Sequence, residues 1–241
     1  VYKLDPDATF VEDVTLTNDA TWIITGRTAV GEDKGGSDRT QTATLYIQQG
    51  TSVIGETGND FIVVRRSSQI KAVGTATSPI NFTSIQDVSG QETAIGQWGG
   101  MVLLGNAPAN SCGDQTGEAT ADELANCGVS AEGAAGNFGG NMPEDSSGEL
   151  KYIVVKHAGK ALGNGDELNG ISFAGVGSGT KVSHIQIHEN LDDGIEFFGG
   201  TVNVDHVVLT SIGDDSLDWS FGWTGTASHI YIQQSAADGD N

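Results

Sequence analysis

A short sequence theme recurs three times between residues 168 and 234, and it restricts the fold more than any other feature. The segments NGISF, DGIEF and DSLDW begin at Asn169, Asp193 and Asp215, which are 24 and 22 residues apart. Each is followed by a second apolar segment, HIQI, HVVL or HIYI. A repeat of this length signals a solenoid, and one made of short alternating strands is typical of a β-helix.

Alternation within each segment predicts which side chains point inward, because successive residues of a strand face opposite sides. The column expected inside the coil is Ile171, Phe173, Ile195, Phe197, Leu217 and Trp219, and the outer column is Ser172, Glu196 and Asp218. The second segments each begin with a histidine and would form an outward ladder of His184, His206 and His229. Imidazoles suit transition metals, but identical residues at one coil position also stack without a ligand, and we favour the plain ladder.

Composition is consistent with one all-β domain. The 241 residues include 35 Gly and only 4 Pro, and long segments with the period of a helix are almost absent. We therefore expect a single β-helix domain over residues 1–241. Within it we expect an N-terminal cap and loop at 1–40, a loop insertion at 105–148 and regular coils at 150–241 that are truncated at the C-terminal end.

The formal charge is strongly negative, at -21 with 32 acidic and 11 basic residues. Such a surface repels nucleic acid and anionic membranes and attracts cations. No apolar run approaches the roughly 20 residues that span a bilayer. We therefore expect no nucleic-acid partner and no membrane span.

Cys112 and Cys127 are the only cysteines and lie 15 residues apart in the expected insertion. One disulfide closing a surface loop is the favoured interpretation, and two unlinked thiols are the alternative. A bond of this kind would contribute about 3 kcal/mol on chain-entropy grounds. It fits an exported protein, because disulfides persist in oxidising compartments.

Several longer segments, among them GQWGGMVLLGNAPAN, DDGIEFFGGTVNVDHVVL and DDSLDWSFGWTG, carry a family resemblance. In this order they resemble a family of secreted or cell-surface bacterial β-helix proteins of the pectate-lyase type, over roughly residues 43–241. The resemblance implies a right-handed parallel β-helix exported by Gram-negative bacteria. It implies no activity, since fold alone does not supply one.

The acidic turns are the candidate site. Asp192 and Asp193 align with Asp214 and Asp215 one coil later. Adjacent coils lie about 4.8 Å apart, where two unit charges repel by roughly 3.5 kcal/mol at an effective dielectric near 20. A bound Ca²⁺ would offset this repulsion, since it prefers six to eight oxygen ligands. We predict a calcium site formed by Asp192, Asp193, Glu196, Asp214, Asp215 and Asp218, with Asp193 and Asp215 as the best ligands; solvated turn residues are the alternative.

The same aspartates are also weak catalytic candidates. Paired carboxyls about 6.5 to 9.5 Å apart serve inverting glycosidases, and Asp192 or Asp193 with Asp214 or Asp215 could meet that spacing. The histidine and basic motifs of β-helix hydrolases are absent, however. Trp223 is a weak candidate for stacking on a sugar ring, and a packed corner is the favoured alternative.

The chain stops at SAADGDN, where the next turn should begin. An open strand edge is a template for association, so end-to-end self-association at the C-terminal coil is a further expectation. Together these features predict an exported, calcium-stabilised structural, adhesion or glycan-binding module on a bacterial cell surface. Its partner would be a polysaccharide or another surface protein. The alternative is a polysaccharide lyase or glycoside hydrolase.

Overall fold

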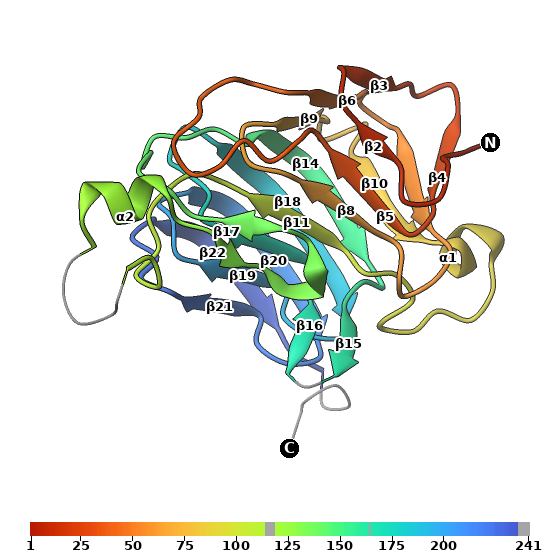
Figure 1. Ribbon diagram of the computed structural model, residues 1–241. Helices are drawn as coiled ribbons and strands as arrows, with labels where there is room; N and C mark the ends of the chain where they lie inside the picture. Colours follow the sequence, from red (N-terminus) through yellow and green to blue (C-terminus); the bar gives the residue numbers. More distant parts are fainter. Residues whose placement is uncertain (114–118, 164, 236–241) are drawn as a thin grey trace.

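The computed structural model describes residues 1–113, 119–163 and 165–235, and they form a right-handed parallel β-helix, as the sequence predicts (Figure 1). Strands account for 45% of the residues and helices for 6%, which fixes the all-β class. The last six residues, including most of the segment expected at the open end, lie outside the described residues.

Two parallel sheets run along the axis. The larger, sheet A, contains β1 (Tyr2–Lys3), β4 (Thr21–Ile24), β7 (Ser52–Gly55), β10 (Ile80–Ser84), β14 (Gly148–Lys156), β18 (Lys181–Asn190), β20 (Asn203–Ile212) and β22 (Ala227–Gln233), with β3 (Val14–Leu16), β6 (Thr44–Ile47) and β9 (Gln69–Val73) joined through β14. Sheet B contains β2 (Thr9–Phe10), β5 (Arg27–Val30), β8 (Phe61–Val64), β11 (Met101–Leu104), β17 (Ile171–Ala174), β19 (Ile195–Phe198) and β21 (Leu217–Ser220).

Sheet A has a bend that runs along the axis, and one residue of each long strand produces it. β9 pairs with the first half of β14 and β10 with its second half, so β14 covers two faces of the coil. The residues at the bend, Tyr152, His184, His206 and His229, have φ angles of 50° to 56°. Histidine is among the residues that tolerate this left-handed region best. The bend also explains why buried Val182 and Ile185 are three residues apart rather than two.

The first 30 residues, which we expected to form part of a cap, already contain strands of the β-helix. Their strands already pair in parallel with later coils, for example Tyr2 with Trp22 and Trp22 with Val53. The sequence signal was weak here because the strands are only two to four residues long. The regular coils therefore begin nearer the N-terminus than residue 40.

The main core fills the inside of the coil and contains most of the expected column. Ile171, Phe173, Ile195 and Phe197 are each at most 1% exposed. Burying one such side chain contributes roughly 1.5–3 kcal/mol. The prediction fails at Trp219, which is 59% exposed: it pairs with Phe197 in register but belongs to the last described coil, which has no further coil stacked on it.

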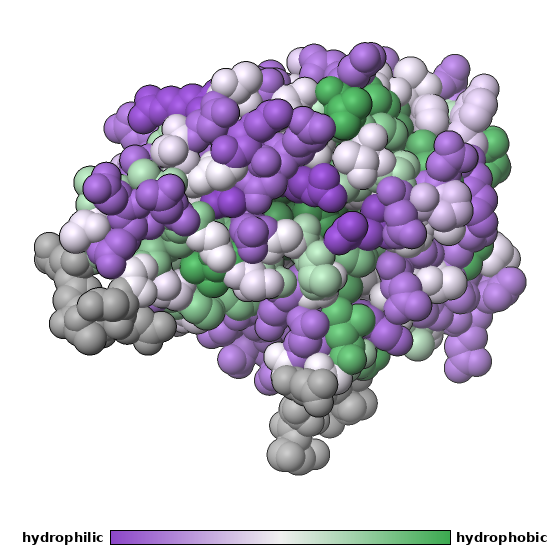
Figure 2. Space-filling view, viewed as in Figure 1, coloured by the Kyte–Doolittle hydropathy of each residue, from purple (hydrophilic) through white to green (hydrophobic). Residues whose placement is uncertain are grey.

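A second apolar cluster lies on the outer side of sheet B, beneath the segment between β11 and β14. This segment carries α2 (Ala121–Ala125), β12 (Val129–Ser130), the 3-10 helix η1 (Glu132–Ala134) and β13 (Asn137–Phe138). Phe138 is 1% exposed and packs with Phe198, Val102 and Leu104. The segment therefore lies against the β-helix, in front of sheet B (Figure 1). This face of the molecule is hydrophilic over much of its area, with hydrophobic residues visible near its centre (Figure 2).

The disulfide Cys112–Cys127 is formed, which confirms the predicted pairing. Beside it, the guanidinium of Arg66, only 4% exposed, donates two hydrogen bonds to the carboxylate of Asp33 and two to the carbonyls of Cys127 and Gly139. One buried cation thus joins the coil, the N-terminal loop and the insertion.

Two remaining elements lie outside the coils. The helix α1 (Ile85–Ser89) follows β10, and Ser84 caps it by accepting from the backbone of Asp87. The antiparallel hairpin of β15 (Lys160–Gly163) and β16 (Asp166–Leu168) projects below sheet B (Figure 1). Among the described residues, no helix is long and apolar enough to cross a membrane.

Candidate functional site

The candidate site is an acidic cluster at the end of sheet B, formed by Glu132, Asp192, Asp193, Glu196, Asp214 and Asp218. Asp192 and Asp193 lie in the turn before β19, and Asp214 lies in the turn before β21. Glu196 and Asp218 are partners in register on β19 and β21, next to inward-facing core residues. The coil repeat therefore brings together five of the six acids that the sequence suggested.

Two groups of three carboxylates overlap at Asp193. One oxygen from each of Asp192, Asp193 and Asp214 lies within 4.8 Å of the others, and the same holds for Asp193, Glu196 and Asp218. Two oxygens on opposite sides of one Ca²⁺ are about 5 Å apart, since each lies 2.3–2.6 Å from the ion. Each group is therefore compact enough to share a single calcium ion.

Asp215, expected as one of the two best ligands, is placed differently. Its side chain is exposed and belongs to neither group. Its backbone N–H donates to Oδ1 of Asp193 at 3.0 Å, and the N–H of Asp193 donates in turn to Oδ1 of Asn169 at 3.1 Å. Side chains at this turn position therefore cap the next coil, a role that asparagine and aspartate fill equally well.

Glu132 is the one member that sequence reasoning missed. It lies on η1 in the insertion, and Gly133 beside it donates its N–H to the Asp166 carboxylate at 2.8 Å and packs against Leu168. The hairpin thus holds Glu132 over the cluster. No local signal marks it, because its position depends on how the insertion docks against β16.

Burial and mutual repulsion raise the pKa values of the cluster. Desolvation is the largest cause in each case, and neighbouring acids add to it. It raises the pKa of Asp192 to about 6, of Glu132 to about 7, of Asp193 to about 8 and of Glu196 to about 9. The strongest charge effects are Asp192 on Asp193 and Glu132 on Glu196. At neutral pH the cluster therefore holds protons unless a cation replaces them.

Hydrogen bonds only partly offset the burial and mutual repulsion of these carboxylates. Asn169 donates to Oε2 of Glu196 at 2.7 Å, whereas Oε2 of Glu132 is buried without a partner. Across the described residues, no Lys, Arg or His forms an ion pair with Glu132, Asp192, Asp193 or Glu196. The cluster therefore has the ligand chemistry of a hard-cation site.

Trp223 occupies a packed corner. Its ring stacks on Phe197 with centroids 4.2 Å apart, and its indole N–H donates to the carbonyl of Val202 at 3.0 Å. One face of the Trp223 ring is thus covered by Phe197, so less of the ring is open to a sugar. This agrees with the packed corner that we favoured.

Comparison with known proteins agrees with this architecture. A family model described as "Pectate-lyase like beta helix domain" matches residues 8–241, so the chain belongs to the pectate-lyase-like β-helix family. Proteins of this family are typically extracellular. Searches of curated proteins and of solved structures found no match.

Proposed function

We propose that the protein is an exported β-helix module of a bacterial cell surface that binds calcium at the acidic cluster and attaches to glycan. The single observation that carries the calcium part is the pair of overlapping three-carboxylate groups that share Asp193. One calcium ion there would draw ligands from two successive coils. It would also strengthen the contact of the insertion with the coil if Glu132 joins it.

Export and surface location are supported by three features. The chain carries a disulfide, a net charge of -21 and a domain whose family is typically extracellular. Assignment to the surface of a Gram-negative cell, and adhesion to polysaccharide or to another surface protein, belong to the proposal.

Cleavage of polysaccharide is the second candidate. A carboxyl whose pKa lies near 7, such as that of Glu132, suits a general acid. The grouped oxygens, however, lie within 4.8 Å of one another, which is closer than the roughly 6.5–9.5 Å between the carboxyl groups of inverting enzymes and also below the roughly 5–5.5 Å of retaining enzymes. A lyase would also need a basic residue to abstract a proton, and Lys156, on β14, forms an ion pair with Asp87 instead. These distances favour a cation over a pair of catalytic acids.

The test is thermal unfolding in EDTA, followed by titration with Ca²⁺ and, separately, Mg²⁺. We expect Ca²⁺ to raise the melting temperature and Mg²⁺ to act weakly, because Mg²⁺ requires near-octahedral geometry and gives up water reluctantly. The variant Glu196→Gln should lose the response, while Glu92→Gln, at an exposed acid outside the cluster, should keep it. An identical melting temperature with and without Ca²⁺ would refute the calcium site, and cleavage assays on acidic and neutral polysaccharides would then address the second candidate.

A further inference from the structure

A groove of about 460 Å³ runs along the bend of sheet A, away from the acidic cluster. One side is the ladder of rings at the bend, formed by Tyr152, His184, His206 and His229. Successive ring centroids are 4.3, 4.7 and 4.4 Å apart, so the rings stack along the axis and confirm the expected ladder.

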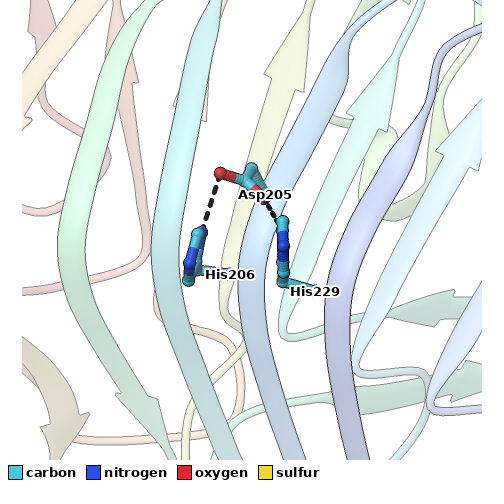
Figure 3. Close-up of side chains that lie close together, drawn as sticks. All are labelled: Asp205, His206 and His229. Carbon is cyan, nitrogen blue, oxygen red and sulfur yellow. Dashed lines mark hydrogen bonds and ion pairs between the residues drawn. The ribbon is translucent and has the colours of Figure 1, made fainter.

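Asp205 fixes the orientation of two of these rings. Its carboxylate oxygens lie 2.7 Å from Nδ1 of His206 and 2.7 Å from Nδ1 of His229, one oxygen to each ring (Figure 3). Hydrogen bonds from Ser228 and the two histidines lower the pKa of Asp205, so it accepts as a carboxylate. A neutral histidine that donates through Nδ1 has Nε2 as an acceptor. These rings therefore offer acceptors for hydroxyl groups at one-coil spacing.

This arrangement is a poor metal site, although Asp205, His206 and His229 are close together. The rings of His206 and His229 are inclined by only 16° and stacked face to face. The lone pairs of a ring nitrogen lie in the ring plane, so two nearly parallel rings cannot both point at one ion. The ladder is better suited to a ligand that extends along it.

The other side of the groove is formed by outward-facing side chains on the part of sheet A that follows the bend. Val154, Gln186, Val208 and Tyr231 are partners in register on four successive strands. Val208 and Tyr231 are 37% and 55% exposed. Among the described residues that line the groove, none is Asp, Glu, Lys or Arg, on a chain with a net charge of -21. The lining itself is thus uncharged and consists of aromatic, amide and apolar side chains. Charges beside it include the Asp205 carboxylate on the ladder and the Lys151 ammonium, which lies 5.7 Å from the centre of the Tyr152 ring.

We infer that this groove binds a neutral linear oligosaccharide lying parallel to the helix axis. Apolar side chains and the Tyr231 ring would contact the faces of the sugar rings, while the histidines and Gln186 would bond to hydroxyls. A peptide fits less well, because extended peptides gain affinity by adding to a free sheet edge. β14, β18 and β20 have partners on both sides, and β22 is the only groove strand with a free edge in the described part of the chain. A peptide added at that edge would run along β22 and not along the groove. The inference rests on the glycan-binding part of the proposed function and is independent of calcium.

The test is isothermal titration of the whole protein in EDTA with cellohexaose, xylohexaose and mannohexaose, and with hexagalacturonate as the anionic counterpart. We expect at least one neutral hexasaccharide to bind and hexagalacturonate not to bind, because no Lys or Arg is among the described residues that line the groove and the Asp205 carboxylate lies beside it. Tyr231→Ala and His206→Asn should each weaken binding about fivefold or more. Asparagine also tolerates the left-handed backbone, so the second variant keeps the bend.

Tyr2→Ala is the matched control, because Tyr2 is 61% exposed and lies outside the groove; it should bind like wild type. Absence of binding by all neutral probes, or equal binding by wild type and both groove variants, would overturn the inference. So would binding only of an uncharged peptide of alternating valine and glutamine. Since EDTA is present throughout, failure here leaves the calcium proposal standing, and a missing calcium response leaves this result standing.

Discussion

Replacement of Asp193 by asparagine separates the two roles of this side chain. As an acceptor, Oδ1 of Asp193 caps the N–H of Asp215, and Asn169 already fills the same role one coil earlier. As a charge, Asp193 lies 8% exposed among other carboxylates. Asp193→Asn keeps the first role and removes the second. Its new amide would face Asp218, as the amide of Asn169 faces Glu196.

The magnitude follows from the pKa of Asp193, raised from 3.8 to about 8 by burial and by Asp192. Between pH 4 and 8 the folded state then binds more protons than the unfolded state, so stability falls as pH rises through this window. At pH 7 the cost is at most about 4 kcal/mol, since each pH unit above the unfolded pKa contributes about 1.4 kcal/mol. Structural relaxation and water near the carboxylate reduce this cost. We therefore expect the free energy of unfolding of Asp193→Asn in EDTA to exceed that of the wild type by roughly 2 kcal/mol.

The assay is urea unfolding followed by tryptophan fluorescence, in EDTA and in excess Ca²⁺, at pH 5 and pH 7. The advantage of the variant should shrink at pH 5, where Asp193 of the wild type is protonated. In Ca²⁺ the order should reverse, because only the wild type supplies the full carboxylate set. A variant less stable than wild type at pH 7 in EDTA, or an advantage independent of pH, would refute this reasoning.

Two further substitutions address the scaffold. Arg66→Ala should destabilise the protein by about 3–5 kcal/mol in urea unfolding, because it leaves Asp33 and two buried carbonyls without their donor; a loss below 1 kcal/mol would show that the contact is dispensable. His206→Val should lower the free energy of unfolding by about 1–3 kcal/mol, because a β-branched residue is strained at a φ of 55°. His206→Asn should change it little, since asparagine tolerates this backbone conformation. Equal losses in the two variants would indicate that ring stacking, and not backbone conformation, is what matters at this position.

Much of the fold follows from local patterns in the chain. The repeated segments by themselves predict that Ile171, Ile195 and Leu217 are in register, as the structure has them, because alternation in a strand is set by backbone geometry alone. The same repeat also predicts that the acidic turns of successive coils lie next to one another and that the histidines form a ladder. Two cysteines in one irregular segment, in a chain with the composition of an exported protein, favour the bond that the structure contains, although the sequence alone leaves unlinked thiols as an alternative.

Other features depend on which segments dock together. Glu132 joins the acidic cluster because Gly133 and Leu168 meet across 35 residues of sequence, and Arg66 is buried because the N-terminal loop and the insertion close over it. Asp193 and Asp215 occupy equivalent turns, yet one is buried and the other exposed, because Asp215 lies in the last described coil. Sequence determines repeat and register through local backbone geometry. Burial, and with it the charge state of the acids, is decided only when distant segments pack.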